Sequence, residues 1–427
     1  MNSRSTTRRR FLQTAAAGLA LPTVLSSRSR GAVSASEQIT LGFIGVGTMG
    51  RGHLGSFLGY PDVQVVAVCD VVKERREHAK QAVEQRYADE RAKGGFKGCA
   101  DYPDFRELLA REDIDAVLIA TPDHWHAIPC VLAAKAKKDI YCEKPLTHSV
   151  VEGRKVVEAA ADNKIVFQTG SQQRSEFGGL FRRAVELVRN GHIGNVKTVR
   201  VGVGGPAVPC KLPDQDTPEG TEWDVWLGPA PERGFHEELC PKGVHRHFPA
   251  WRNYQEYAGG GLADMGAHHF DIAQWALDMD GGGPVKIEPP EGGGDGLKFT
   301  YANGVVMHHG GKSGCTFEGD KGTIYVDRGA LQSDPADILK IELAEGAWRA
   351  YPSSDHRRNW IECIKSREPA ICTAEIGHRS ASVCHLGNIG YRLRRALEWD
   401  PKTEKFVRDD EADTLLWRAP REKWDVI

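Results

Sequence analysis

Three polar side chains of this sequence could together remove a proton from a hydroxyl group. Asp264 and His268 lie four residues apart, so on a helix they would share one face. A carboxylate beside an imidazole suits a general base, because it orients the ring and stabilises the protonated form. Lys144 follows a predicted strand directly, is held by Pro145, and could stabilise a developing alkoxide. We interpret Lys144, Asp264 and His268 as a candidate catalytic set.

The elements that must position this set begin with a glycine-rich turn. The apolar run 39–44 leads into Gly45-Val46-Gly47-Thr48-Met49-Gly50, a spacing that turns a strand sharply into a helix and brings the backbone close to a pyrophosphate. A second apolar run, 63–69, ends in Asp70, about 20 residues further on, where a carboxylate suits the ribose hydroxyls of NAD. The pattern predicts an NAD-binding domain. Three nearby cations leave NADP as an alternative: Lys73, Arg75 and Arg76.

Strands and helices alternate up to about residue 168, which predicts a doubly wound parallel sheet of the Rossmann type. Further strands are expected at 115–121, 139–142 and 165–168, and helices at 71–93, 127–137 and 150–161. Ligands of such sheets bind at the carboxyl ends of the strands. We therefore expect one crevice to collect the polar residues that follow strands: Asp70, His126, Lys144 and the run Gln172-Gln173-Arg174.

Beyond about residue 170 the pattern is that of an α+β domain. Strands are expected at 196–203, 323–326 and 338–343 and in a hairpin over 297–308, and helices at 181–190, 356–365 and 378–397. Sequential strands without helices between them favour a mostly antiparallel sheet. The segment 204–256 has no regular periodicity and is rich in Trp and His. A segment of that length is usually functional.

The N-terminal segment has the form of a twin-arginine export signal. Thr7-Arg8-Arg9-Arg10-Phe11-Leu12-Gln13 precedes the apolar stretch 15–25 and the small-residue motif Val33-Ser34-Ala35. The apolar stretch is too short to span a bilayer and is interrupted by Pro22. We predict a signal peptide at 1–35, handled by the twin-arginine export machinery. The mature protein would be periplasmic or otherwise extracytoplasmic, exported folded with its dinucleotide bound.

Length and composition limit the other properties of the chain. Its 427 residues allow two or three domains, and we predict a Rossmann domain at 36–168 and a substrate-binding α+β domain at 169–427. The net charge of −2 argues against nucleic acid or a membrane surface as a partner. The ten cysteines show neither a C-x-x-C pair nor a zinc-binding spacing, so no metal site is predicted.

Taken together, the motifs resemble the Gfo/Idh/MocA family, which includes glucose–fructose oxidoreductases and inositol dehydrogenases. The resemblance covers nearly the whole mature chain and rests on the glycine motif and five further stretches: Thr121-Pro122-Asp123-His124-Trp125-His126, Glu143-Lys144-Pro145, Trp226-Leu227-Gly228-Pro229-Ala230-Pro231, Asp264-Met265-Gly266-Ala267-His268 and Leu386-Gly387-Asn388-Ile389. It implies a Rossmann domain, a second α/β domain whose large open sheet often forms subunit contacts, and a nicotinamide cofactor. It further implies hydride transfer at a sugar or polyol carbon and a homodimer or homotetramer.

The resemblance also implies roles for single residues. His268 would take the hydroxyl proton, with Asp264 and Lys144 polarising the system. The cofactor-binding residues would be Gly45, Gly47, Thr48, Met49, Gly50, Asp70, Thr121, Pro122, His124, His126, Glu143 and Lys144. The candidates for carbohydrate binding are Gln172, Arg174, His245, Trp251, Arg252, Tyr254 and His268.

Three other functions are compatible with the sequence. Because free NAD is scarce outside the cytoplasm, an exported relative could keep its cofactor and work as a redox-neutral glycosidase: it would oxidise the sugar, eliminate the leaving group, add water and return the hydride. A non-catalytic sensor could use the same scaffold, although the intact catalytic set counts against it. A metal hydrolase would need ligands from two segments, and their spacing is not a zinc signature: His245, His247, His268 and His269.

Overall fold

The N-terminal sheet of the computed structural model, which describes residues 38–291 and 296–427, consists of six parallel strands in the order β3-β2-β1-β4-β5-β6. These are β1 (Ile39–Ile44), β2 (Val63–Cys69), β3 (Ala100–Tyr102), β4 (Ala116–Ile119), β5 (Asp139–Cys142) and β6 (Phe167–Thr169). A strand buried on both faces needs a continuous run of apolar residues; the sequence of β4 is such a run, and that of β2 is nearly so. The predicted doubly wound sheet is confirmed, with the strand order reversing between β1 and β4.

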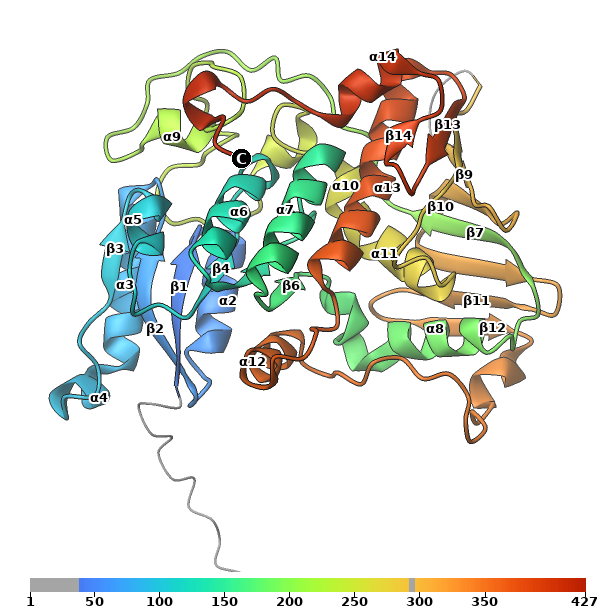
Figure 1. Cartoon of the computed structure of the whole chain (residues 1–427), viewed down its shortest axis with the longest axis horizontal. Coiled ribbons are helices and arrows are strands. Elements are labelled where there is room, and N and C mark those ends of the chain that lie inside the picture. The colour runs from blue at the N-terminus through green and yellow to red at the C-terminus, as the bar shows by residue number, and fades with distance from the viewer. Residues whose placement is uncertain (1–37, 292–295) are drawn as a thin grey trace, which may run out of the picture. The chain divides into compact units, whose positions relative to one another are not determined.

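Helices cover both faces of this sheet (Figure 1). One face is covered by α2 (Thr48–Phe57), α3 (Lys73–Arg86) and α12 (His356–Ser366), and the other by α5 (Phe105–Leu109), α6 (Ala127–Lys135) and α7 (Val150–Asn163); α4 (Ala88–Ala92) follows α3. The ring of Trp360 on α12 is fully buried and lies 5.8 Å from Phe57 and 5.6 Å from Tyr141. A helix from late in the chain therefore completes the core of the first sheet.

The second sheet has eight strands and is antiparallel. Its order is β12-β11-β10-β9-β8-β13-β14, with β7 paired to β10. The strands are β7 (Val196–Gly202), β8 (Lys286–Glu288), β9 (Lys298–Thr300), β10 (Val306–Gly319), β11 (Thr323–Val326), β12 (Leu331–Asp334), β13 (Leu397–Asp400) and β14 (Lys405–Phe406). The predicted α+β architecture is confirmed.

One face of the second sheet carries helices and the hydrophobic core. The helices are α8 (Leu180–Arg189), α11 (Gly266–Ala276) and α13 (Ala374–Leu393), with the short α10 (Gly261–Asp264) and α14 (Asp410–Asp413) at the edges. On the opposite face Arg200 of β7 forms an exposed ion pair with Glu318 of β10, at 2.8 Å. That face presents polar side chains rather than a second apolar layer.

The strand predicted at 338–343 is wrong, because these residues lie in a 3₁₀ helix, Ala336–Lys340, and the loop that follows it. Pro335, with φ −61°, precedes the helix and suits the start of a helical turn. Lys340 pairs with Asp337 at 2.7 Å, and Ile338 is buried in the core of the second sheet. The apolar residue serves to anchor this turn to the core.

The irregular segment 204–256 contains one α-helix, α9 (Trp223–Leu227), and a 3₁₀ helix, Ala250–Asn253. Its aromatic side chains form a small core of their own. Within it Trp223 stacks on Trp226 at 4.8 Å, and Tyr257 meets Trp226 edge-on at 5.1 Å. This packing gives an otherwise irregular segment a fixed surface.

Three further observations concern the described residues. No helix among them is both long and apolar enough to cross a membrane. All ten cysteines lie among them and none is paired in a disulfide. The predicted signal peptide at 1–35 lies outside the described residues.

Candidate functional site

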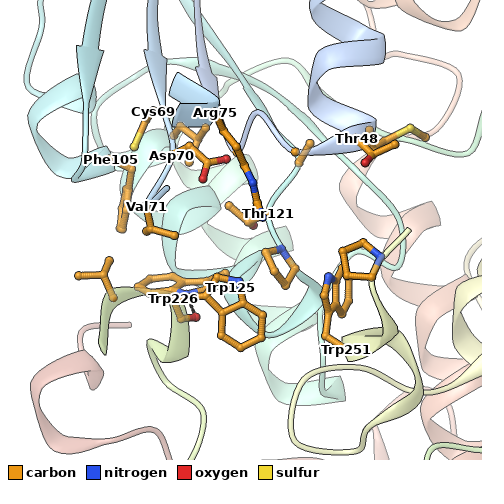
Figure 2. Close-up of a pocket in the computed structure, with 18 of the residues that line it drawn as sticks. Thr48, Cys69, Asp70, Val71, Arg75, Phe105, Thr121, Trp125, Trp226 and Trp251 are labelled. Carbon is orange, nitrogen blue, oxygen red and sulfur yellow. Dashed lines mark hydrogen bonds between the residues drawn. The ribbon is translucent and has the colours of Figure 1, made fainter. Parts of the chain in front are cut away.

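A cleft of about 850 Å³ lies at the carboxyl ends of β1, β2 and β4 (Figure 2). Its glycine turn leaves room for a bound group. A Cβ on Gly45, where φ is +86°, would lie 2.7 Å from the Ala120 carbonyl oxygen, and a Cβ on Gly50 would lie 2.0 Å from that of Gly45. A Cβ on Gly47 would meet nothing within 4 Å. Close packing thus requires the first and third glycines, while the second borders open space at the start of α2, as a pyrophosphate needs.

Asp70 directly follows β2 and faces this cleft (Figure 2). Its carboxylate accepts hydrogen bonds of 2.9 Å from the backbone N–H groups of Val46 and Val72, which fix its position. The neighbouring cations have other partners: Arg75 donates to backbone carbonyls of the irregular segment, and Arg76 donates to the Asp70 carbonyl. The geometry therefore presents a carboxylate to the ribose position, as an NAD site requires.

Aromatic side chains form the opposite wall of the cleft. Figure 2 shows Trp125 and Trp226 across from Asp70, with Trp251 further along the cleft, on the side of Thr48. Trp125 donates its indole N–H to the Trp226 carbonyl oxygen at 2.9 Å. The buried Thr121 hydroxyl has no hydrogen-bond partner among the described residues and lines the cleft. These observations fit a site that takes a dinucleotide.

Residues 241–247, which we call the clamp segment, lie against the glycine turn. Thr48 donates its hydroxyl to the His247 carbonyl oxygen at 2.9 Å, and Arg51 donates to the His245 carbonyl oxygen. Arg75 donates to the carbonyl oxygens of Gly243, at 3.1 Å, and Pro241. Three side chains of the first domain thus hold the clamp segment over one edge of the cleft.

A second cavity, of about 1040 Å³, adjoins the cleft, and we call it the catalytic cavity. The two share five lining residues: Met49, Ala120, Thr121, Trp251 and Arg252. Lys144 enters the cavity just after β5, Asp264 at the end of α10 and His268 from the first turn of α11. The structure thus brings the three candidate catalytic residues together beside the cofactor cleft.

Lys144 and Asp264 form the central ion pair of the catalytic cavity. The ammonium Nζ donates to Asp264 Oδ1 at 2.6 Å and to the Asp264 carbonyl oxygen at 2.7 Å. Burial alone would raise the pKa of Asp264, but Lys144 and then Arg252 outweigh it and hold that pKa below its ordinary value. Asp264 is therefore ionised and keeps the lysine in place.

His268 is neutral, and one of its ring nitrogens is buried without a hydrogen-bond partner among the described residues. Burial, reinforced by Lys144 and Arg328, holds the pKa of His268 well below its ordinary value. Its buried Nδ1 has no hydrogen-bond partner in the part of the chain that the structure describes. The expected contact from Asp264 to His268 is not formed, because the lysine takes that carboxylate instead. The imidazole is thus a base without an orienting carboxylate.

A buried network fixes Glu143 on another side of the cavity. Its carboxylate accepts hydrogen bonds of 2.7 Å from both His53 Nε2 and the Gln172 amide. Arg357 donates to His53 Nδ1 at 2.9 Å, so the imidazole proton lies on the nitrogen that faces Glu143. Burial opposes ionisation of Glu143, but His53 leads the interactions that hold its pKa below the ordinary value.

Asp123 lines the same cavity but is mostly protonated at neutral pH. Its side chain is 6% exposed, and burial raises its pKa to about 8 despite the nearby charges of Lys144 and Arg252. The cavity therefore contains one carboxyl group that titrates close to physiological pH.

Arg174 was expected to contact the substrate, but its side chain is buried away from both cavities. It is 1% exposed and lines neither cavity. Its guanidinium donates to both oxygens of Asp271, at 2.8 Å each, and to both of Asp280, at 2.7 and 2.9 Å. Trp275 stacks beneath it at 4.9 Å. This side chain joins the segment after β6 to the middle of α11 and to the turn that follows that helix.

Two other expected substrate ligands lie elsewhere. Tyr254 lines neither cavity, and its hydroxyl donates to Glu238 at 3.4 Å. His245 lines the cofactor cleft instead of the catalytic cavity, and burial, followed by Arg75, lowers its pKa to about 4. Of the expected set, Gln172, Trp251, Arg252 and His268 do line the catalytic cavity.

Two histidines of the expected cofactor-binding set line neither cavity and form hydrogen bonds to backbone carbonyl groups. His124 lines neither cavity and hydrogen-bonds to the Trp226 carbonyl oxygen at 3.0 Å. His126 bridges the carbonyl oxygens of Thr121, at 2.9 Å, and Pro145, at 2.7 Å. They therefore fix cleft-lining segments rather than face a ligand.

Several cavity residues carry no signal in the sequence. Arg328 comes from the turn between β11 and β12, Arg357 from α12, and Glu176 and Phe177 from the stretch after β6. His53 is an ordinary position on α2 until its contact with Glu143 is seen. Glu176 and Phe177 lie just after the predicted run Gln172–Arg174, and this proximity is the only sequence signal for any of these residues.

The four histidines of the metal-hydrolase alternative do not come together at one site. His245 and His247 pack on each other at 4.5 Å beside the glycine turn, whereas His268 lines the catalytic cavity. Across residues 38–291 and 296–427, no three His, Cys, Asp or Glu side chains are arranged to hold a metal ion.

Comparison with known proteins identifies both halves of the chain. Residues 39–171 match the family profile described as "Oxidoreductase family, NAD-binding Rossmann fold", and residues 208–426 match "Oxidoreductase family, C-terminal alpha/beta domain". The chain is 29% identical over 169 residues to myo-inositol 2-dehydrogenase of Thermotoga maritima, covering 40% of this chain and 46% of that protein. It is 32% identical over 168 residues to a glycosyl hydrolase family 109 protein of Saccharopolyspora erythraea, covering 39% and 35%.

These curated relatives match over less than half of their own length. Solved structures align more fully. A levoglucosan dehydrogenase in complex with NADH and levoglucosan superposes with a TM-score of 0.57 at 18% identity, covering 84% of this chain and 99% of that one. This likeness shows the fold.

Proposed function

Because the chain belongs to the Gfo/Idh/MocA family of oxidoreductases, we propose that it transfers hydride between a hydroxyl-bearing carbon of a sugar, polyol or glycoside and a tightly bound NAD. The observation that carries the proposal is the meeting of Lys144, Asp264 and His268 in one cavity that adjoins the NAD cleft. When bound, NAD supplies the acceptor for the hydride.

The proposed roles follow from the protonation states. His268 accepts the proton of the substrate hydroxyl, because its imidazole is neutral and the residue lines the catalytic cavity. The Lys144 ammonium stabilises negative charge that develops on that oxygen, and Asp264 holds the ammonium in position. Trp251 and Arg252 border both cavities and are proposed to contact the carbohydrate.

The clamp segment supports tight retention of the cofactor. Its carbonyl oxygens are bound by Thr48, Arg51 and Arg75, so opening that edge of the cleft breaks several hydrogen bonds at once. Retention favours a second candidate, a redox-neutral glycoside hydrolase in which the hydride returns to the substrate after the leaving group has gone. The likeness to a family 109 glycosyl hydrolase supports this alternative.

We test the function on the protein purified without added cofactor, by following the reduced-nicotinamide absorbance as sugars and aryl glycosides are added. Lasting reduction by a sugar supports the oxidoreductase. Release of an aglycone without lasting reduction supports the hydrolase. A protein that neither contains nor binds a nicotinamide dinucleotide contradicts both.

The pH dependence of kcat/KM is expected to have its acid limb below pH 6.5, the ordinary pKa of histidine. A base must be unprotonated to act, and because the pKa of His268 is lowered, the ring stays unprotonated to a lower pH. The profile is to be measured on the Asp123→Asn variant as well, which removes any limb near pH 8 due to Asp123. An acid limb that stays at or above pH 6.5 in both proteins would contradict His268 as the base.

Asp70→Ala is expected to weaken NAD binding about 10-fold and to reduce discrimination against NADP, because the ribose hydroxyls lose a charged acceptor. Dissociation constants for both dinucleotides give the measurement. Asp101→Ala is the matched control, since this carboxylate lies on the neighbouring strand β3, pairs with Lys80 at 2.8 Å and does not line the cleft. Unchanged cofactor preference would show that Asp70 does not reach the ribose.

Export and assembly are further proposals. The twin-arginine motif at 7–13 supports an extracytoplasmic location for the folded protein. The polar, uncovered face of the second sheet supports subunit contacts in a homodimer or homotetramer.

A further inference from the structure

The catalytic cavity is lined by four cationic side chains, and three of them have carboxylate partners. Lys144 pairs with Asp264 at 2.6 Å, Arg252 approaches the same carboxylate at 3.8 Å, and Arg357 pairs with Glu176 at 3.1 Å. Arg328 is the fourth, and within the described ranges no carboxylate lies at ion-pair distance from it. The cavity thus has one cationic group without an anion.

Arg328 is nevertheless held in one orientation. Its Nε donates to the Gln173 side-chain oxygen at 3.1 Å, and its guanidinium stacks on the ring of Phe177 at 4.9 Å. The turn that carries it is fixed by Asp327, which accepts hydrogen bonds from the backbone N–H groups of Gly329, at 2.8 Å, and Ala330, at 2.7 Å. The Asp327 carboxylate is therefore engaged away from the guanidinium.

This anchoring leaves the two terminal nitrogens of Arg328 without a hydrogen-bond partner among the described residues. A guanidinium fixed through Nε and one face presents these two nitrogens as a fork, which matches the two oxygens of a carboxylate. Gln173 also donates to the His268 carbonyl oxygen at 3.3 Å, so the fork is tied to the backbone of the proposed base. A carboxylate bound by the two terminal nitrogens would therefore be held at a fixed distance from the hydroxyl group on which His268 acts.

We propose that the substrate is an acidic carbohydrate whose carboxylate is bound by Arg328. This proposal rests on the proposed function and specifies its substrate class. Arg328 is a specificity residue in this scheme, because it lines the catalytic cavity only and has no part in the NAD cleft. Lys144 and His268 act on a hydroxyl group of the same molecule.

The test compares sugars with the corresponding uronic acids on the protein with bound NAD. Binding is measured by the change in tryptophan fluorescence, and turnover by KM and kcat. We expect the acid to bind at least about 10-fold more tightly than its neutral counterpart, as a charged bidentate contact would allow. A sugar phosphate of the same ring provides a third arm. Equal binding of acid and neutral sugar, or a preference for the phosphate, would overturn the carboxylate assignment.

Variants at Arg328 locate the effect. Arg328→Gln should remove the preference for the acid, mainly through Kd and KM, while NAD affinity stays unchanged, because Arg328 does not line the cofactor cleft. Arg328→Lys keeps the charge but not the fork and should restore the preference only in part. Arg392→Gln removes an equal charge from an exposed arginine that lines a different cavity and should leave the preference intact.

The variants also separate this inference from the proposed function. If neutral and acidic sugars are both turned over and Arg328→Gln changes neither, only the inference fails. If no carbohydrate of either class reduces the cofactor or loses an aglycone, the proposed function itself fails. Loss of NAD from Arg328→Gln would also overturn the assignment, because it would place this residue at the cofactor.

Discussion

Lys144→Met is expected to lower kcat by about 10³-fold while the protein keeps its NAD. The ammonium is the only positive charge that donates directly to Asp264 among the described residues, and we place it at the oxygen where negative charge develops. Losing a preorganised donor at such a point typically costs about 10²–10³-fold in rate, and the proton transfer that depends on it adds to this. Single-turnover reduction of the bound cofactor measures the chemical step directly.

Lys135→Met is the matched control for this change. It removes an exposed lysine at the end of α6 that lines neither cavity, and it should leave kcat unchanged. Two readouts decide the result for Lys144→Met: the nicotinamide content of the purified protein and its thermal unfolding midpoint. If the variant loses its cofactor or its fold, Lys144 has a structural role and the assignment to chemistry is contradicted.

Arg174→Met is expected to reduce the free energy of unfolding by about 3–5 kcal/mol. Asp271 is fully buried, so the substitution leaves a carboxylate in the core without its cation. Asp280, on the other side of the guanidinium, is part-exposed and can recover some hydration. Unfolding in urea, followed by tryptophan fluorescence, gives the measurement. KM for a carbohydrate should change little in the folded fraction, because Arg174 lines neither cavity.

A surface pair provides the comparison for this experiment. Lys340→Met breaks the exposed pair with Asp337, whose side chains are 80% and 84% exposed, and should cost less than about 1 kcal/mol. The double variant Arg174→Met, Asp271→Asn should regain part of the lost stability, because it removes the unpaired charge. A loss below about 1 kcal/mol for Arg174→Met alone would contradict the structural role.

Much of the fold is predictable from local sequence because the relevant signals are short. The turn at 45–50, the strand before it and Asp70 lie within about 30 residues of one another, as a dinucleotide-binding unit requires. The buried parallel strands appear in the sequence as continuous apolar runs. Strands with one face in solvent alternate apolar and polar residues instead, so the two kinds of strand can be told apart. Lys144 could be assigned to the crevice because strand ends gather at one edge of such a sheet, whereas His268 was assigned to the same site only through the family resemblance.

The partners of charged residues could not be predicted in this way. Arg174 follows a strand just as Lys144 does, yet one is buried against Asp271 and the other lines the cavity. Sequence spacing placed Asp264 beside His268, whereas the ion pair it forms is with a residue 120 positions away. Pairing is decided by which segments the tertiary fold brings together. Arg328, in a turn without a motif, shows the same limit.

The burial of Trp360 in the first sheet affects the order in which the chain can fold during synthesis. The strands of the nucleotide-binding lobe leave the ribosome early, but the side chain that fills their core against Phe57 and Tyr141 follows some two hundred residues later. Folding of an N-terminal domain often proceeds while synthesis continues. Here the hydrophobic core on one face of the first sheet stays incomplete until α12 has emerged, so this sheet reaches its final packing only after most of the chain has been translated.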